Sequence, residues 1–528
     1  QHPSRSYFIY KTIIIYNLYG VDIIDEAVEI CKLRLFLKLV AQIDSVNHIE
    51  PLPDIDFNIK AGNTLVGFAT KSEVKQAITP TLDFDNNLGK ITDKAEDVQV
   101  LYDMFLQAQM EGDDSASDFK TELRRKLDKL NTTLNHYLAG EYGVDVTSKE
   151  DYESWLVSHK PFHWFVEFYG ILANGGFDVI IGNPPYVVYN KVDNYTIRNF
   201  VTISCNDLYA FVIERSICLS RKKGKLSLII PISYLSTDGF IPLRDFVKTN
   251  CSFSWNSSYA MRPAKLFEGA EKHLCIIVLE KMKDLEYCLF VTKYYRWKSE
   301  QRTTLFPLIK YIKINEKMFI HNSIPKIGSI SEKRIFNKFI EENDKIENYF
   351  KPNGKHMLVH TRKLRYFVQF LDKPPRIVDK DGKIRITSEL KTVSFDYGYY
   401  RDSALATFCS SLFFWYFLAL SDCRNLNKRE VVGFPISLDK ISKTLTKDLS
   451  KLSRKLMNNL QSNSTINTIN YKKYGKLEIQ VFSPRVSKPI IDKIDKILAT
   501  HYGFTDEELD FIINYDIKYR IGKELNPD

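Results

Sequence analysis

The first part of the chain alternates short apolar runs with an amphipathic stretch. An interrupted apolar run over 13–23 predicts a β-strand with an acidic end. Apolar residues then recur at helical spacing, which predicts a helix from Glu26 to about Ala41 with Asp25 as its N-cap. A second short strand, 57–65, ends in a polar turn. This order is typical of a nucleotide-binding α/β sheet, in which ligands bind at the carboxyl ends of the strands.

The pattern then changes twice. Residues 70–165 are polar and contain helical stretches such as 119–138, with a loop at 111–115, so they predict a helical insertion. After this insertion strands and helices alternate again until about residue 300. We predict strands over 177–181, 226–231 and 274–280, and helices over 207–220 and 240–249.

Beyond residue 300 the chain has short strands and few long amphipathic runs. We predict a buried helix over 405–421, a loop over the Asn-, Ser- and Thr-rich stretch 458–470, and a helix over 488–502. Thr505 and Glu508 have the spacing of a capping box that opens a last helix. These features indicate a separate α+β region.

Composition narrows the class of protein. At 528 residues, with 44% hydrophobic and 26% charged residues, the chain predicts two or more ordinary globular domains. Its eight scattered cysteines suit a reducing cytoplasm and argue against a zinc site or a disulfide scaffold. The aromatic-rich run 412–420 is too short to span a bilayer. The first residues form no signal peptide and include no initiator methionine, so we interpret the chain as a fragment.

Charge is unevenly distributed between the two halves. Residues 301–528 hold 40 Lys and Arg against 26 Asp and Glu, whereas residues 1–300 hold 34 against 39. A basic second half suggests that a polyanion docks there, although a basic domain is also often just a solvated surface.

The most informative motif is Ile-Ile-Gly-Asn-Pro-Pro-Tyr-Val at 180–187, where a buried apolar run ends in a rigid polar turn. Each proline fixes its own φ and pushes the preceding residue out of the helical region, so the loop is stiff. The Asn183 side-chain oxygen and the Pro184 carbonyl are both acceptors, and together they can take the two N–H bonds of an exocyclic amino group. Tyr186 can stack on the ring that carries this group. The alternative is an ordinary strand exit with a Pro-Pro stop.

In this order the motifs resemble those of gamma-type DNA adenine-N6 methyltransferases, above all the large enzymes of type IIG restriction–modification and related phage-defence systems. The resemblance implies a Rossmann-like sheet, S-adenosyl-L-methionine as the methyl donor, and no metal for methylation. The acceptor would be N6 of a flipped-out adenine in double-stranded DNA, and the location a prokaryotic cytoplasm. The segments that carry the resemblance are 18–23, 61–65, 181–186, 229–231, 488–492 and 501–505.

The resemblance also divides the chain. It implies a methyltransferase domain in two parts, a helical insertion between them, a target-recognition domain that binds DNA, and a C-terminal helical segment. In that order along the chain, the expected bounds are 1–69, 70–165, 166–300, 301–480 and 481–528.

Three positions match the family's cofactor site. Asp22 would accept the two ribose hydroxyls of S-adenosyl-L-methionine, since an ionised carboxylate only accepts hydrogen bonds. Ile23 would pack on the cofactor's adenine, and Asn63 would contact the same ring. The plainer alternatives are a helix-capping Asp, a core Ile and a turn-forming Asn.

For the target base, the resemblance implies that Asn183, Pro184, Pro185 and Tyr186 form the catalytic loop. Phe267 would pack on the flipped base opposite Tyr186, although a loop Phe facing the core is the alternative. Flipping costs a few kcal/mol, and aromatic stacking at about 1–3 kcal/mol per base offsets much of that.

The basic second half would hold the duplex through its phosphates and read the sequence from a groove. The best candidates for contact with DNA form a dense polar cluster after the buried helix, and the alternative is a solvated helix end. The cluster consists of Arg424, Asn425, Asn427, Lys428 and Arg429.

The chain departs from the family's pattern at its start. The family's glycine-rich cofactor loop and first strand should precede Asp22, yet the 21 preceding residues contain no such loop. Nor does the chain contain a convincing Asp…Glu-x-Lys nuclease arrangement. We therefore expect a C-terminal piece of a longer enzyme that alone binds the cofactor weakly or not at all. An upstream nuclease domain or a partner subunit would supply the missing part.

Three other functions remain open. Protein glutamine methyltransferases share the Asn-Pro-Pro-Tyr loop but are much smaller. Cytosine-N4 methylation is chemically similar, but Ser usually replaces Asn in that loop. From a different class, the chain could be a sequence-specific DNA-binding subunit without catalysis. Asn183→Ala would distinguish this last function, because it abolishes methylation and leaves DNA binding nearly unchanged.

Overall fold

The computed structural model describes residues 4–79, 84–283, 285–364, 366–387, 389–471 and 475–521. The chain divides into two compact units. The first contains residues 1–228, 245–252 and 279–285, and the second contains residues 229–244, 253–278 and 286–528.

The first unit begins with a small α/β motif. Helix α1 (Arg5–Asn17) starts at Ser4, whose side chain accepts a hydrogen bond from the Tyr7 N–H. Strand β1 (Gly20–Asp22) and strand β2 (Ile59–Ala61) pair in parallel, and helix α2 (Asp25–Val40) connects them. The strand predicted over 13–23 is therefore wrong for its first part, because Ile14 and Ile15 are buried as one side of α1. Asp25 is the first residue of α2, and Ile24 is the N-cap.

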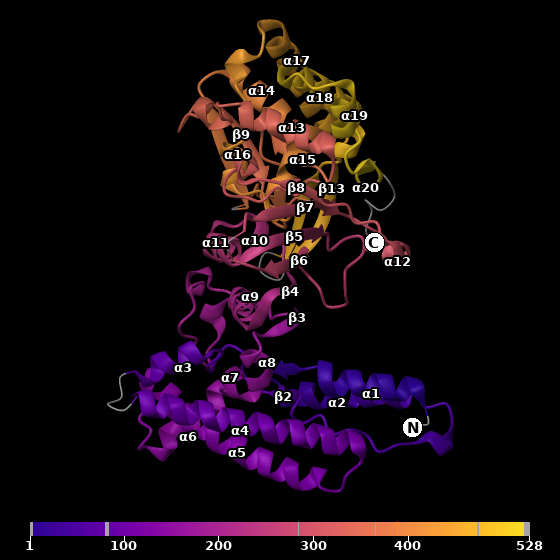
Figure 1. Cartoon of the computed structure of the whole chain (residues 1–528). Coiled ribbons are helices and arrows are strands. Elements are labelled where there is room, and N and C mark those ends of the chain that lie inside the picture. Colours follow the sequence, from indigo (N-terminus) through magenta and orange to yellow (C-terminus); the bar gives the residue numbers. More distant parts are fainter. Residues whose placement is uncertain are drawn as a thin grey trace. The chain divides into compact units, whose positions relative to one another are not determined.

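The predicted insertion is helical, as expected. Its two long helices, α4 and α5, lie side by side, and the predicted loop 111–115 joins them (Figure 1). Leucines at helical spacing on α5, including Leu134 and Leu138, pack with Trp155 in one apolar cluster. The helices are α3 (Lys71–Ile78), α4 (Phe84–Glu111), α5 (Ala116–Glu141), α6 (Lys149–His159), α7 (Trp164–Glu167) and α8 (Tyr169–Ala173).

A second pair of parallel strands follows the insertion. Strand β3 (Phe177–Gly182) pairs with β4 (Ser220–Pro231) in a register that places Gly182 opposite Leu228. Helix α9 (Leu208–Leu219) connects the two strands and is buried along most of its length. The predicted strand 177–181 and helix 207–220 are confirmed, whereas β4 begins six residues before the predicted start.

The second unit holds the mixed part of the sheet. Strand β5 (Cys251–Tyr259), which the sequence did not predict, pairs in parallel with β7 (Cys288–Tyr295). Strand β7 pairs antiparallel with β8 (Ile312–Ile314), beyond the expected boundary at 300. The predicted strand 274–280 is β6 (Leu274–Lys281), and the predicted helix 240–249 is α11 (Ile241–Asn250); each of these elements has residues in both units.

The remaining elements of this unit form helices and two antiparallel three-stranded sheets, β10-β9-β12 and β11-β14-β13. The strands are β9 (His356–Thr361), β10 (Phe370–Leu371), β11 (Ile377–Asp379), β12 (Leu390–Phe395), β13 (Thr465–Tyr471) and β14 (Gly475–Val481). The helices are α10 (Ser233–Ser236), α12 (Arg302–Leu305), α13 (Ile330–Glu341), α14 (Gly398–Phe408), α15 (Ser411–Leu420), α16 (Lys428–Val432), α17 (Lys443–Ser462), α18 (Lys488–Tyr502), α19 (Asp506–Ile513) and α20 (Ile517–Ile521).

Two predictions for this region need correction. The buried helix 405–421 is two helices, α14 and α15, bent by 64° at a break where Ser410 caps the second helix. The predicted loop 458–470 is wrong, because α17 continues to Ser462 and β13 follows it. Helix 488–502 and the capping box of Thr505 and Glu508 are confirmed.

Among the described residues, no single helix combines the length and apolar composition needed to cross a membrane; only the bent pair α14–α15, counted as one, meets that criterion.

Candidate functional site

Two of the expected cofactor residues lie at the carboxyl ends of neighbouring parallel strands. Asp22 ends β1, and Asn63 follows the end of β2. The Gly62 N–H donates a hydrogen bond of 2.8 Å to the Asp22 carbonyl, which fixes the two strand ends against each other. Asp22 and Asn63 therefore lie at the same end of this strand pair, and their contact with a cofactor stays a prediction.

Asp22 presents its carboxylate to solvent. Its Oδ1 accepts a hydrogen bond of 2.8 Å from the Ile24 N–H, and its Oδ2 has no hydrogen-bond partner among the described residues. The next residue, Ile23, is half-buried. An exposed carboxylate oxygen at the end of a parallel strand is suitably placed to accept hydrogen bonds from a diol.

Asn63 is buried, with 2% of its surface exposed. Its Oδ1 accepts a hydrogen bond of 3.1 Å from the Leu65 N–H, which is the turn-forming role expected of an Asn here. Its Nδ2 is buried and has no hydrogen-bond partner among the described residues. Because an unsatisfied buried donor costs about 1–3 kcal/mol, this amide is a candidate to donate to a bound ligand.

Lys160, which was not singled out from the sequence, contacts the residues at both of these strand ends. Its carbonyl accepts a hydrogen bond of 2.8 Å from the Asn63 N–H. Its Nζ donates to the Ile23 carbonyl at 3.3 Å and pairs with Asp25 at 2.5 Å. The hydrogen bond from Lys160, together with its charge, lowers the pKa of the Asp25 carboxyl. Lys160 is far from these residues in the sequence, because the whole insertion intervenes, so no local signal could reveal it.

The Asn-Pro-Pro-Tyr turn lies directly after β3. Asn183 is exposed, Pro184 is buried and Tyr186 is half-buried. The Tyr186 hydroxyl donates a hydrogen bond of 2.7 Å to Asn183 Oδ1. Burial raises the pKa of Tyr186 to about 12, so the hydroxyl keeps its proton at neutral pH. The loop is anchored after the turn, where the Leu208 N–H at the start of α9 donates to the Val187 carbonyl at 3.0 Å.

Strand β3 lies at the edge of its sheet and carries exposed apolar side chains. Val179 is 60% exposed and Ile181 is 77% exposed. Residues two apart in a strand share a face, so these side chains form one exposed apolar strip. Among the described residues, β1 and β3 are not hydrogen-bonded to each other and belong to separate sheets. The single continuous sheet expected from the sequence is thus divided here.

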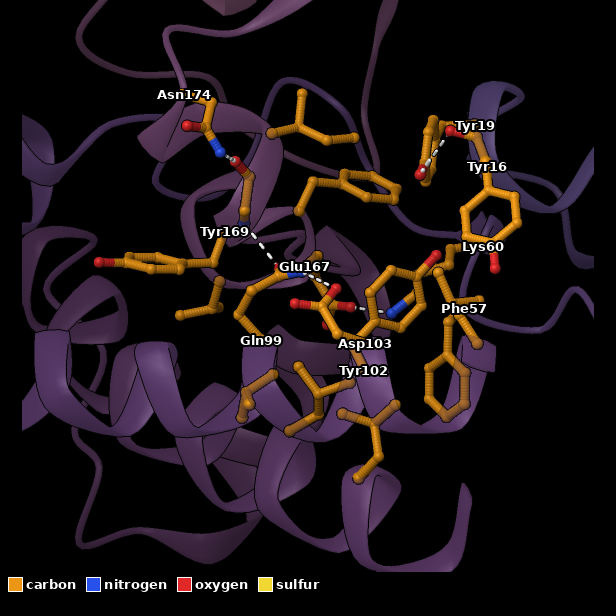
Figure 2. Close-up of a pocket in the computed structure, with 18 of the residues that line it drawn as sticks. Tyr16, Tyr19, Phe57, Lys60, Gln99, Tyr102, Asp103, Glu167, Tyr169 and Asn174 are labelled. Carbon is orange, nitrogen blue, oxygen red and sulfur yellow. Dashed lines mark hydrogen bonds and ion pairs between the residues drawn. The ribbon is translucent and has the colours of Figure 1, made fainter. Parts of the chain in front are cut away.

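A cavity of about 560 Å³ lies at the opposite ends of these strands. Tyr19, Phe57 and Gly176, which line it, come just before β1, β2 and β3 respectively. Figure 2 shows Lys60 paired with Glu167 inside it. Because ligands of parallel α/β sheets bind at the carboxyl ends of the strands, this cavity is not the expected cofactor site.

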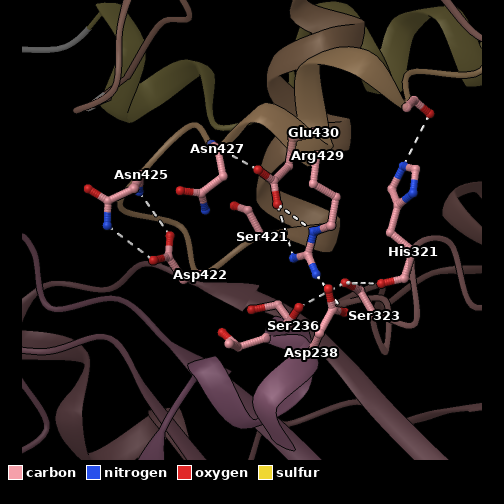
Figure 3. A network of polar contacts seen from close by, with 12 residues as sticks. Ser236, Asp238, His321, Ser323, Ser421, Asp422, Asn425, Asn427, Arg429 and Glu430 are labelled. Carbon is pink, nitrogen blue, oxygen red and sulfur yellow. Dashed lines mark hydrogen bonds and ion pairs between the residues drawn. The ribbon is translucent and has the colours of Figure 1, made fainter. Parts of the chain in front are cut away.

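Members of the expected DNA-contacting cluster form hydrogen bonds and ion pairs with other residues of the protein (Figure 3). Asn427 caps α16 in a capping box with Glu430. Arg429 pairs with Glu430 at 3.0 Å and with Asp238 at 3.2 Å. Arg424 and Lys428 are exposed. Contact of this cluster with DNA stays a prediction, as does that of Phe267, which is half-buried in the loop between β5 and β6.

The comparison with protein families covers the part of the chain that contains the strand ends and the Asn-Pro-Pro-Tyr turn. Residues 16–264 match the model described as "Eco57I restriction-modification methylase". This stretch, just under half of the chain, is similar to an Eco57I restriction-modification methylase domain. The domain contains Asp22, Asn63, Asn183 and Tyr186, whereas Phe267 and the 424–429 cluster lie outside it.

Curated relatives of this methylase domain belong to restriction–modification systems. A Methanocaldococcus jannaschii protein named as a candidate type II restriction enzyme and methyltransferase, RM.MjaORFECS2P, is 28% identical over 52% of the chain. The Escherichia coli type II restriction enzyme and methyltransferase RM.Eco57I is 27% identical over 23%, and the Haemophilus influenzae type II methyltransferase M.HincII is 29% identical over 25%. The matches span 27%, 13% and 27% of these relatives' lengths, respectively.

Solved structures with some likeness to the chain include two restriction–modification enzymes. The type IIL enzyme MmeI, solved in complex with DNA, is 11% identical over 65% of this chain and 57% of its own, with a TM-score of 0.33. The type IIG restriction endonuclease BpuSI is 12% identical over 67% of this chain and 55% of its own, with a TM-score of 0.26. At these scores neither likeness carries an argument about this chain.

Proposed function

We propose that the chain carries the methyl-transfer part of a site-specific DNA methyltransferase of a restriction–modification system, which methylates N6 of adenine. The observation that carries this proposal is the Asn-Pro-Pro-Tyr turn at the carboxyl end of β3, within the methylase domain. The exposed Asn183 leaves its side chain accessible to a substrate, and the two prolines hold the loop backbone rigid.

In this proposal the turn binds the amino group of the target adenine. Asn183 Oδ1 and the Pro184 carbonyl accept its two N–H bonds, which orients the nitrogen lone pair out of the ring plane. Held in this way, the amine nitrogen would accept the methyl group that a bound sulfonium donor would supply, leaving the donor as a thioether, and one amine proton would pass to water. The turn therefore acts mainly by positioning the amine for attack.

Tyr186 has two tasks in this proposal. Its ring stacks on the flipped base. Its hydroxyl occupies Asn183 Oδ1 until a substrate arrives, so the amine must replace this hydrogen bond. The exchange costs about 0.5–1.5 kcal/mol, the net value of one such bond, and it keeps the Asn183 side chain oriented in the absence of DNA.

The residues at the ends of β1 and β2 fit the nucleoside part of S-adenosyl-L-methionine. When bound, the cofactor supplies an electrophilic methyl group on a sulfonium. Asp22 Oδ2 accepts from the ribose hydroxyls, and Asn63 Nδ2 donates to an acceptor on the adenine ring. Ile23 packs against the ring, and Lys160 positions both strand ends.

We further propose that an additional strand completes the sheet at the exposed edge of β3. An apolar edge strand is a ready template for pairing, and Val179 and Ile181 offer it an apolar face. This strand comes from another polypeptide segment, either of a longer chain or of a partner subunit. With it, the fold becomes the Rossmann-like sheet expected from the sequence.

Nucleoside mass spectrometry tests the proposed reaction. Genomic DNA is digested from cells that produce the polypeptide containing these residues, as wild type or as Asn183→Ala. We expect N6-methyladenine with the wild type and none with the variant. Asn174→Ala is the matched control, since it removes an exposed Asn just before β3 and should leave methylation unchanged. Accumulation of N4-methylcytosine, or of N6-methyladenine with Asn183→Ala, contradicts the proposal.

The alternative function is a DNA-binding specificity subunit without catalysis. The observation that favours it is the division of the strands that carry Asp22 and Asn183 between two sheets. This alternative predicts sequence-specific DNA binding by the wild type and Asn183→Ala alike, with no methylated nucleoside in either case.

A further inference from the structure

Helix α17 combines a buried apolar face with a strongly basic one. Leu449, Leu456 and Leu460 are buried. On the opposite side, cations recur every three or four residues, and Asp448 is the single acidic residue of the helix. These cations are Lys443, Lys447, Lys451, Arg454 and Lys455. The four lysines are spaced four residues apart, so the stripe extends over about 18 Å of the helix.

The charges of this stripe are largely uncompensated. All five cations are exposed. Arg454 contacts Asp402 at 3.3 Å while its side chain remains 73% exposed. The four lysines form no ion pair with any of the described residues. An exposed lysine is ordinary, but a row of four that forms no ion pair among the described residues, with Asp448 as the single acidic residue of the helix, gives a local field that attracts anions.

The stripe also lines a hollow of about 610 Å³. Tyr399, at the start of the neighbouring helix α14, forms one wall. This residue is 47% exposed, and its ring stacks on that of Tyr397 with 5.5 Å between the ring centroids. The other lining residues all come from α17, and none of the lining is acidic or aliphatic: Thr446, Lys447, Ser450, Lys451, Arg454, Lys455 and Asn458.

We propose that this basic face of α17, together with Tyr399, binds the phosphodiester backbone of double-stranded DNA. The proposal rests on the proposed DNA methyltransferase function and names the surface that holds the substrate. Lys and Arg ammonium and guanidinium groups neutralise successive phosphates, while Ser, Asn and Tyr side chains donate hydrogen bonds to phosphate oxygens. Contacts of this kind position the duplex and carry no sequence information.

The composition of the hollow and the packing of α17 favour DNA over an acidic protein or an anionic membrane. A protein partner normally buries an apolar core at its interface, and this hollow has no aliphatic lining to offer one. A membrane-binding helix inserts its apolar face, whereas the apolar face of α17 is already packed inside the protein.

Binding of a duplex oligonucleotide by the full chain, without cofactor, tests this surface. The triple variant Lys447→Ala, Lys451→Ala and Lys455→Ala removes three expected phosphate contacts. We expect its Kd to rise about 10- to 100-fold. The slope of log K against log salt should become shallower by about 0.9 for each lost contact. Fluorescence anisotropy over a salt series measures both quantities.

A matched triple variant controls for net charge. Lys90→Ala, Lys94→Ala and Lys129→Ala remove three exposed lysines from α4 and α5, and we expect little change in Kd or salt slope. Thermal unfolding of both triple variants establishes that they are folded. Equal losses of affinity in the two triple variants would overturn the proposal, because binding would then follow net charge alone.

Two further measurements separate this proposal from the proposed function. Asn183→Ala should abolish methylation but keep the wild-type salt slope of duplex binding, since in these proposals Asn183 contacts the target base and the α17 cations contact the phosphates. If the wild type binds the duplex and the α17 variant binds it equally well, the α17 surface is refuted while the methyltransferase proposal stands. Poly-glutamate should compete poorly at matched charge; effective competition would instead indicate an acidic protein as the partner and refute the DNA assignment.

Discussion

Helices α5 and α17 are built alike on one face and differently on the other. Each packs a row of leucines into its own unit, and each carries five Lys and Arg residues. On α5 these cations stand among four acidic residues of the same helix, and most of them form ion pairs. On α17 one acidic residue accompanies the five cations, and a single ion pair is formed among the described residues.

The cations of α5 and those of α17 differ in whether they form ion pairs inside the protein. On α5, Lys120 pairs with Asp54 and Asp56, and Arg124 also contacts Asp56, so these charges tie the insertion to the loop before β2. On α17 the charges serve no internal contact that would explain their number. Hydrophobic periodicity alone cannot distinguish these helices; the positions of the carboxylates can.

The largest expected effect comes from substitutions in the buried leucine faces that α5 and α17 have in common. Leu134→Ala on α5 and Leu449→Ala on α17 each remove a fully buried leucine, and each should destabilise its own unit by about 2–5 kcal/mol. Hydrogen exchange of the helix amides, followed by mass spectrometry, localises each loss. The volume-conserving variants Leu134→Met and Leu449→Met should cost less than about 1.5 kcal/mol. Equal loss from the Ala and Met variants would mean that packing does not hold these helices.

The next largest effect comes from charge reversal on the exposed faces, where α5 and α17 differ. Charge reversal on α17, Lys447→Glu with Lys451→Glu, should weaken duplex binding by about 100-fold, since it both removes phosphate contacts and adds repulsion. Reversal on α5, Lys126→Glu with Lys129→Glu, changes net charge equally and should weaken binding far less. The anisotropy titration used for the alanine variants measures both. A larger loss from the α5 pair would place the DNA on the insertion instead.

The spacing of apolar and capping residues predicted many of the helices and strands. The helical insertion, the strand before Asn183 and the final capping box follow from spacing alone. The first residues misled because Ile13–Ile15 favour strands by composition, yet Ser4 caps a helix there and Ile14 and Ile15 pack as one of its sides. Stretch 458–470 misled because its Asn and Ser suggest a loop, yet Leu460 still packs with α17 and β13 pairs with β14.

The candidate site was predictable where a strand end marks it. Asp22 and Asn183 could be proposed from the sequence because each stands at the end of a short apolar run. Lys160 was missed because its contacts with Ile23, Asp25 and Asn63 depend on how the insertion returns to the sheet. The exposed edge of β3 was missed for a similar reason, since Val179 and Ile181 look like core residues until their surroundings are known.

A smaller effect is expected when carboxylates are placed beside the cations of α17, as they are on α5. Ser450→Glu and Asn458→Glu each introduce a carboxylate within three or four residues of the cations, which forms helical ion pairs. We expect duplex affinity to fall about tenfold while helix stability rises by about 0.3–0.5 kcal/mol per pair. The neutral pair Ser450→Gln and Asn458→Gln, which keeps a hydrogen-bond donor at each position, is the control and should change affinity far less than the Glu variant. Unchanged affinity in the Glu variant would show that the lysines do not act as free charges.

The smallest effect tests whether the ion pairs of α5 stabilise its unit. Burial acts to raise the pKa of Asp56, but hydrogen bonds from Lys120 and Lys32, with their charges, lower it to about 2. Since the folded pKa lies below the unfolded value of 3.8, this contribution is present above pH 4 and is lost as the pH falls toward 2. Asp56 is 36% exposed, so solvent screening limits the gain to about 1 kcal/mol or less.

Urea unfolding at pH 7, 4 and 2.5, followed by hydrogen exchange in α5, measures that contribution. Asp56→Asn should lower stability at pH 7 and approach the wild type at pH 2.5, because the wild-type carboxyl is then partly protonated. Asp448→Asn on α17, where the structure shows no ion pair for this carboxylate among the described residues, should cause no such pH-dependent difference. If both variants change alike with pH, acid sensitivity reflects net charge, and the paired cations of α5 contribute no more to stability than the unpaired ones of α17.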